Sequence, residues 1–63
     1  MTFAEKLLNF RIENNLSQKA TAALFNVHQS DISEYEVGKR EPNKLNRAYY
    51  ERRMDNYERS KEK

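Results

Sequence analysis

The side chains with the most informative chemistry lie in the stretch from His28 to Glu36, HQSDISEYE. If this stretch is helical, its outward face carries amide, hydroxyl and carboxylate groups, at Gln29, Ser30, Ser33 and Glu34. Such groups can form hydrogen bonds to base edges in the major groove of DNA: Gln pairs with adenine N6 and N7, and Glu accepts from cytosine N4. The stretch therefore indicates recognition chemistry rather than bond breaking.

Residues for catalysis or metal binding are sparse. The chain has one histidine, His28, without a companion nucleophile, and it has no cysteine. The pairs Glu51/Asp55 and Asp55/Glu58 have helical spacing and lie near arginines, so we expect ion pairs rather than catalytic carboxylates. A glycine-rich phosphate loop and metal-ligand spacing are both missing from the sequence. We therefore predict no enzyme activity, no catalytic residue, no metal, no cofactor and no small-molecule substrate.

Composition predicts one small helical domain. The chain has 63 residues, of which 37% are hydrophobic and 35% charged, with a single Gly and a single Pro. Residues 1–36 carry three basic and five acidic side chains, whereas residues 37–63 carry nine and five. A basic C-terminal half is compatible with a polyanionic partner such as nucleic acid. No apolar run is long enough to span a bilayer and no signal-peptide pattern opens the chain, so we expect no membrane association and a cytoplasmic location.

A first helix is expected to begin at Thr2, which forms a capping-box pattern with Glu5, and to end at Asn14-Asn15. Asparagine tolerates the left-handed conformation that follows many helices. Helical periodicity gives this segment a wide apolar face, comprising Phe3, Leu7, Phe10, Leu8 and Ile12.

Two short helices follow, over residues 18–25 and 28–36. Ser17 is a good N-cap for the first, Asn26 can form the turn between them, and Gly38 ends the second. This arrangement is a helix-turn-helix pattern. Val27, Ile32 and Tyr35 are expected to anchor its second helix to the core, which leaves the polar side chains named above facing outward.

Asn43 is expected to cap a final helix from Lys44 to Tyr57, so that residues 1–57 form the domain and residues 58–63 a frayed polar tail. Along this helix the side chains expected to close the core are Leu45, Ala48 and Tyr49. A neighbouring face carries Tyr50, Met54 and Tyr57, which either contact a dimer or protein partner or pack on the edge of the core. The predicted fold is all-α, a compact four-helix bundle.

From Leu7 to Pro42 the chain resembles the phage repressor/Cro-type (XRE-like) helix-turn-helix DNA-binding domains. The matching residues are Arg11, Leu16-Ser17-Gln18, Ala22, Phe25, Val27, Ile32-Ser33, Tyr35-Glu36 and Gly38-Lys39-Arg40-Glu41-Pro42. The resemblance implies a bundle of the lambda-repressor-like type. It also implies a sequence-specific transcriptional regulator of double-stranded DNA, acting in a bacterial or phage-infected host cell. The helix over residues 28–36 would then enter the major groove, with a homodimer on a palindromic operator.

The resemblance also implies a role for individual residues. Base edges would be contacted by Gln29, Ser30, Ser33 and Glu34, and DNA phosphates by Gln18, His28, Lys39 and Arg40. Arg11 and Glu36 would form a largely buried ion pair between the first and third helices.

The sequence departs from the family pattern mainly in its acidic third helix. Asp31 and Glu34 have no evident cationic partner, and two uncompensated carboxylates weaken binding that depends on phosphate neutralisation. Asn26 replaces the usual turn glycine, and Thr21 replaces a larger apolar residue, which thins the core. An alternative function therefore stays open, a helix-turn-helix scaffold of the antirepressor or antitoxin type. It would bind a partner repressor or toxin through its acidic third helix, with Asp31 as a candidate contact beside Tyr50, Met54 and Tyr57.

Overall fold

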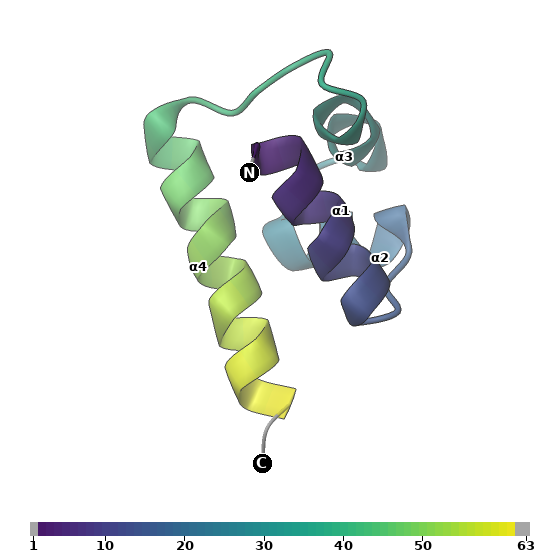
Figure 1. The fold of residues 1–63 in the computed structure, drawn as a ribbon, viewed down its shortest axis with the longest axis vertical. Helices are drawn as coiled ribbons and strands as arrows, with labels where there is room; N and C mark the ends of the chain where they lie inside the picture. The colour runs from purple at the N-terminus through teal and green to yellow at the C-terminus, as the bar shows by residue number, and fades with distance from the viewer. Residues whose placement is uncertain (1, 62–63) are drawn as a thin grey trace.

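Four α-helices make up most of residues 2–61, the part of the chain that the computed structural model describes (Figure 1). They are α1 (Phe3–Glu13), α2 (Gln18–Phe25), α3 (Gln29–Glu36) and α4 (Lys44–Lys61). No strand occurs within residues 2–61, and the prediction of an all-α fold is confirmed. α3 packs against both α1 and α2, while α4 lies beside α1 and also contacts α2 (Figure 1).

Local sequence signals define the ends of α1. The Thr2 hydroxyl oxygen accepts a hydrogen bond from the Glu5 backbone N–H at 3.2 Å, and the Glu5 carboxylate accepts one from the Thr2 backbone N–H at 3.0 Å. The bond from the Thr2 backbone lowers the pKa of the Glu5 carboxyl. α1 ends before Asn15, which has a left-handed φ of 56°. Both the capping box and the asparagine stop are therefore as predicted.

The helix-turn-helix also forms where the sequence indicates. The Ser17 hydroxyl oxygen caps α2 by accepting from the Ala20 backbone N–H at 3.0 Å. Asn26 follows α2 in the left-handed conformation, with φ of 61°, and turns the chain toward α3. His28 is the N-cap of α3, and the helix proper begins at Gln29. Gly38, with φ of 77°, lies just beyond the end of α3.

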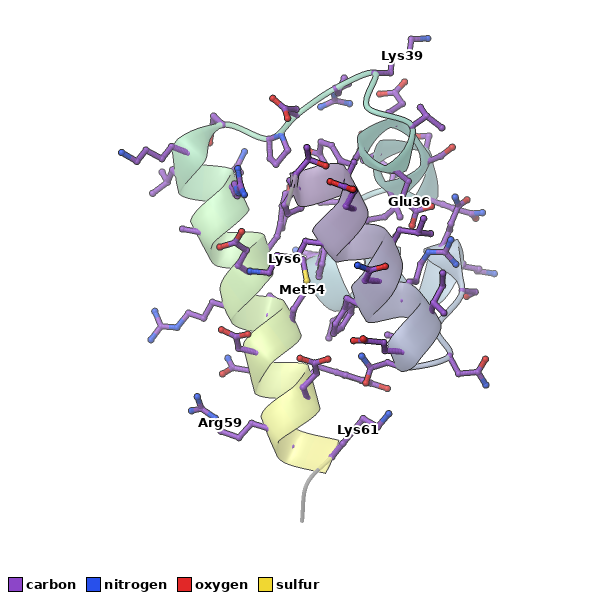
Figure 2. All side chains as sticks on the ribbon, in the orientation of Figure 1. Lys6, Glu36, Lys39, Met54, Arg59 and Lys61 are labelled. Atoms are coloured by element: carbon purple, nitrogen blue, oxygen red, sulfur yellow. The ribbon has the colours of Figure 1, made fainter. Side chains whose placement is uncertain are left out.

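The core gathers apolar side chains from all four helices around Tyr50. Its ring stacks on Phe25 at a centroid distance of 4.9 Å and lies 6.0 Å from the ring of Phe3. Its hydroxyl lies 3.5 Å from the Tyr35 hydroxyl. Met54 points from α4 toward α1 (Figure 2). The buried apolar set is Phe3, Leu7, Phe10, Ala22, Phe25, Ile32, Tyr35, Tyr50 and Met54.

The rotational setting of α4 differs from the prediction. Leu45 is 80% exposed, Tyr49 is 41% exposed and Ala48 is exposed, so these residues do not close the core. Tyr50 and Met54 fill it instead. Consecutive helical positions lie about 100° apart, so adjacent apolar stripes on one helix compete for the core. The aromatic contacts of Tyr50 with α1, α2 and α3 favour its stripe.

Two further predictions, on the buried face of α1 and on the end of α4, are wrong. Leu8 and Ile12 lie outside the core, with Ile12 66% exposed, because only the Phe3–Leu7–Phe10 stripe of α1 faces the other helices. α4 continues to Lys61 rather than ending at Tyr57, so residues 58–61 are helical. The Asn14 side chain holds this end, donating to Glu58 at 3.1 Å and accepting from the Lys61 ammonium at 3.0 Å. Residues 62–63 of the expected tail lie outside the described residues.

The fold also accommodates Thr21, which is fully buried among larger side chains. Its hydroxyl donates to the Ser17 carbonyl oxygen at 2.9 Å, which satisfies the polar atom inside the helix. Among residues 2–61, no helix is long and apolar enough to cross a membrane.

Candidate nucleic-acid interface

The outward face of α3 carries the residues predicted to contact bases. Gln29 and Ser30 are exposed, Ser33 and Glu34 are half-buried, and Ile32 and Tyr35 anchor the opposite side in the core. Helical geometry places Gln29, Ser30 and Ser33 within about 100° of one another and Glu34 at the edge of this group. α3 therefore presents a contiguous polar surface to solvent.

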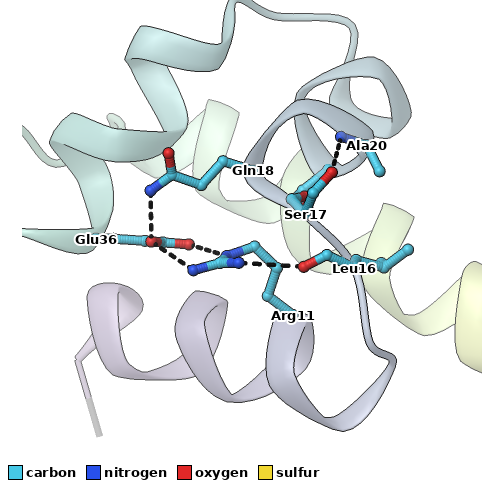
Figure 3. A network of polar contacts seen from close by, with 7 residues as sticks. Arg11, Leu16, Ser17, Gln18, Ala20 and Glu36 are labelled. Atoms are coloured by element: carbon cyan, nitrogen blue, oxygen red, sulfur yellow. Dashed lines mark hydrogen bonds and ion pairs between the residues drawn. The ribbon is translucent and has the colours of Figure 1, made fainter.

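A polar network fixes α3 against α1 and α2 (Figure 3). The Arg11 guanidinium donates from Nε and Nη2 to the two carboxylate oxygens of Glu36, the second bond measuring 3.0 Å. A third nitrogen, Nη1, donates to the Leu16 carbonyl oxygen at 3.1 Å. The Glu36 side chain is 8% exposed and that of Arg11 19% exposed. The predicted ion pair is thus present, and its paired geometry is the strong form of arginine–carboxylate contact.

Gln18, predicted to bind phosphate, belongs to this network. Its side-chain Nε2 donates to Glu36 Oε1 at 3.0 Å (Figure 3). Because an amide nitrogen carries two N–H donors, one remains for a second acceptor. Phosphate binding by Gln18 stays a prediction. Its hydrogen bond to Glu36 also gives Gln18 a structural role, which the sequence did not predict.

Arg40 contacts the two acidic residues of α3 that were expected to lack a cationic partner, Asp31 and Glu34. Its Nη1 donates to Asp31 Oδ1 and to Glu34 Oε1, both at 2.9 Å, and its guanidinium carbon lies 5.5 Å from the centre of the Tyr35 ring. The bonds to Glu34 and Asp31 raise the pKa of the Arg40 guanidinium above its ordinary value. The expectation that Asp31 and Glu34 have no cationic partner is therefore wrong, and Arg40 offsets one of their two negative charges.

The other predicted phosphate-binding residues lie around the α3 surface. Lys39 is exposed and points away from the body of the protein (Figure 2). Within residues 2–61 its ammonium group has no hydrogen-bond or ion-pair partner. His28 is also exposed, at the start of α3, where its backbone N–H donates to Asp31 Oδ2 at 3.2 Å.

The candidate partner contacts on α4 are less available than the sequence suggests. Tyr50 and Met54 are buried, so an external partner cannot reach them without opening the core. Tyr57 is half-buried and packs edge-on against Phe10 at a centroid distance of 5.8 Å. Across residues 2–61, no group of three His, Cys, Asp or Glu side chains is arranged to hold a metal ion.

Comparison with protein families matches residues 7–46 to a family described as helix-turn-helix, which covers more than half of the chain. The match includes the whole of α2 and α3 and the loop that carries Lys39 and Arg40. Comparisons with curated proteins and with solved structures gave no match. The chain belongs to the helix-turn-helix family of DNA-binding regulators that includes the phage Cro and CI repressors.

Proposed function

We propose that this protein is a sequence-specific transcriptional regulator of the phage repressor type that inserts α3 into the major groove of double-stranded DNA. The observation that carries the proposal is the contiguous polar surface of exposed Gln29 and Ser30 with half-buried Ser33, on a helix whose other side is buried. In helix-turn-helix proteins the N-terminal residues of the second motif helix contact base edges. Gln29 is the first residue of α3 and Ser30 the second.

Base recognition would rest on Gln29, with support from the shorter hydroxyls. A glutamine amide donates and accepts at once, which matches the acceptor and donor pair of an adenine. Lys39 and His28 lie beside this surface and would bind phosphate, together with the second N–H of the Gln18 amide. These contacts position α3 without carrying sequence information. Such a protein would act wherever its DNA is held, in a bacterial or phage-infected cell.

A palindromic operator requires two copies of the protein, with their α3 helices about 34 Å apart. Because Tyr50 and Met54 are buried, the apolar side chains that α4 can still offer a second copy are those on its outer face, at Leu45, Ala48 and Tyr49. Three side chains are far fewer than the roughly 20–30 residues per partner of a stable interface. We therefore expect the homodimer to form on the operator rather than in free solution.

The alternative function, binding of a basic repressor or toxin through an acidic third helix, has less support. Each carboxylate of α3 has a cationic partner within the chain: Arg40 for Asp31 and Glu34, and Arg11 for Glu36. These pairs reduce the negative charge that would attract a basic protein. We therefore do not propose the partner-binding role, but the experiment described next would detect it.

The test is selection of bound duplexes from a random DNA pool at physiological salt, followed by affinity measurements over a salt series. We expect a palindromic motif, and an affinity that falls steeply with salt as phosphate contacts release counterions. Failure to enrich any motif would contradict the proposal. Capture of a purified basic repressor by the same protein would then support the partner-binding role.

A further inference from the structure

Arg40 bridges the two carboxylates at the edge of the α3 surface, and the chain path holds it there. Gly38 reverses the backbone with φ of 77°. The backbone N–H groups of Lys39 and Arg40 then both donate to the Glu34 carbonyl oxygen, at 3.0 Å and 3.4 Å. This turn returns Arg40 over the end of α3. The Arg40 bridge, defined as Arg40 with Asp31 and Glu34, is therefore set by the backbone as well as by charge.

We propose that Arg40 is a positioning residue for DNA recognition, which masks the charges of Asp31 and Glu34 and orients the Glu34 carboxylate toward the bases. This inference rests on the proposed function and deepens it. It replaces the implied role of Arg40, a direct contact to backbone phosphate, with an indirect role in affinity and base preference.

Asp31 and Glu34 both place negative charge near the surface that would meet DNA. The Asp31 and Glu34 side chains keep 24% and 35% of their surface exposed, so both carboxylates can interact electrostatically with an approaching DNA backbone. Duplex DNA carries one negative charge per roughly 1.7 Å of its axis, and its affinity for proteins depends on phosphate neutralisation. Without Arg40, two carboxylates beside the base-contacting surface would repel that backbone. Arg40 supplies one positive charge against these two negative charges, and so reduces this repulsion.

Asp31 and Glu34 differ in how many of their carboxylate oxygens accept hydrogen bonds. Asp31 uses both oxygens, one for Arg40 and one for the His28 backbone N–H. Glu34 uses only Oε1, and its Oε2 has no hydrogen-bond partner in the described part of the chain. A carboxylate held by one oxygen presents the other in a defined direction, and Glu accepts from cytosine N4. The structure thus assigns to Glu34 a specificity role that depends on Arg40.

A double-mutant cycle distinguishes two roles of Arg40, masking of the Asp31 and Glu34 charges and direct binding to a DNA phosphate. Arg40→Ala is made in the wild-type protein and in a neutral background carrying Asp31→Asn and Glu34→Gln. The matched control is Lys39→Ala, which removes one positive charge from the adjacent position, where no carboxylate is contacted. Dissociation constants are measured for the selected operator at one salt concentration, and thermal melting confirms that every variant is folded.

We expect Arg40→Ala to weaken binding on the order of tenfold in the wild-type protein and less than about threefold in the neutral background. Lys39→Ala should cost the same factor in both. The base preference opposite Glu34 should change with Arg40→Ala and stay unchanged with Lys39→Ala. Equal costs of Arg40→Ala in the two backgrounds would overturn the inference and leave the proposed function standing. Absence of duplex binding by the wild-type protein would overturn both.

Discussion

Arg11 and Glu36, which are 25 residues apart in sequence, form a two-point ion pair between α1 and α3. The pair joins α1 to the last residue of α3. Arg11 also donates to the Leu16 carbonyl oxygen, and Glu36 also accepts from the Gln18 amide. Because α3 carries the proposed base-contacting surface, this pair would set the angle at which that surface meets DNA. The pair therefore stabilises the fold directly and would affect DNA binding only through the position of α3.

Breaking this pair should strongly destabilise the protein. We expect Arg11→Met to lower the free energy of unfolding by about 3 kcal/mol, since it leaves the nearly buried Glu36 carboxylate without its charge partner. Urea unfolding followed by circular dichroism measures the change. The control is Lys6→Met, which removes the exposed 3.5 Å pair with Glu51 and should cost under about 1 kcal/mol. Similar costs for the two variants would show that the Arg11–Glu36 pair has no special role.

Tyr50 should make the protein sensitive to alkali. Burial, followed by its hydrogen bond with Tyr35, raises the pKa of the Tyr50 hydroxyl to about 12, whereas an unfolded tyrosine titrates near 10. The folded state favours the neutral phenol, so this stabilisation is complete below pH 10 and is lost as the pH rises from 10 through 12. Urea unfolding from pH 8 to 12 should show the decline. Tyr50→Phe should flatten it and Tyr49→Phe should not, and an unchanged decline in Tyr50→Phe would refute the assignment.

The outer face of α4 should contribute to assembly on DNA and little to stability. Leu45→Glu is expected to change the free energy of unfolding by less than about 0.5 kcal/mol, because the side chain is 80% exposed. It should reduce cooperative binding to a two-half-site operator while leaving binding to a single half-site unchanged, as measured by gel shift on both duplexes. Ile12→Glu, on α1 and 66% exposed, is the matched control. Equal cooperativity in the two variants would exclude the α4 face from the dimer contact.

The structural features that can be predicted from this sequence are those determined by neighbouring residues. The Thr2–Glu5 capping box, the Ser17 cap and the left-handed turn at Asn26 each depend on residues within three or four positions. The Arg11–Glu36 pair is not local, and it follows from the family resemblance rather than from spacing.

The rotation of α4 could not be predicted from periodicity. The stripe that begins at Leu45 and the stripe that begins at Tyr50 are both apolar and both have helical spacing. The contacts of Tyr50 with aromatic rings of α1, α2 and α3, which require the three-dimensional arrangement of the helices, decide between them. The Arg40 bridge was missed for a related reason. It depends on the chain path after Gly38, which brings together residues six and nine positions apart.

The central claim, that α3 reads bases through Gln29, is tested most directly by the base preferences of wild-type protein and Gln29→Ala. Both are measured on a set of duplexes carrying every single-base change in the selected operator. We predict that Gln29→Ala loses about 1–3 kcal/mol of discrimination at one base pair in each half-site and retains the preferences elsewhere. An identical preference profile for the two proteins would contradict the claim and show that α3 does not contact bases through this residue.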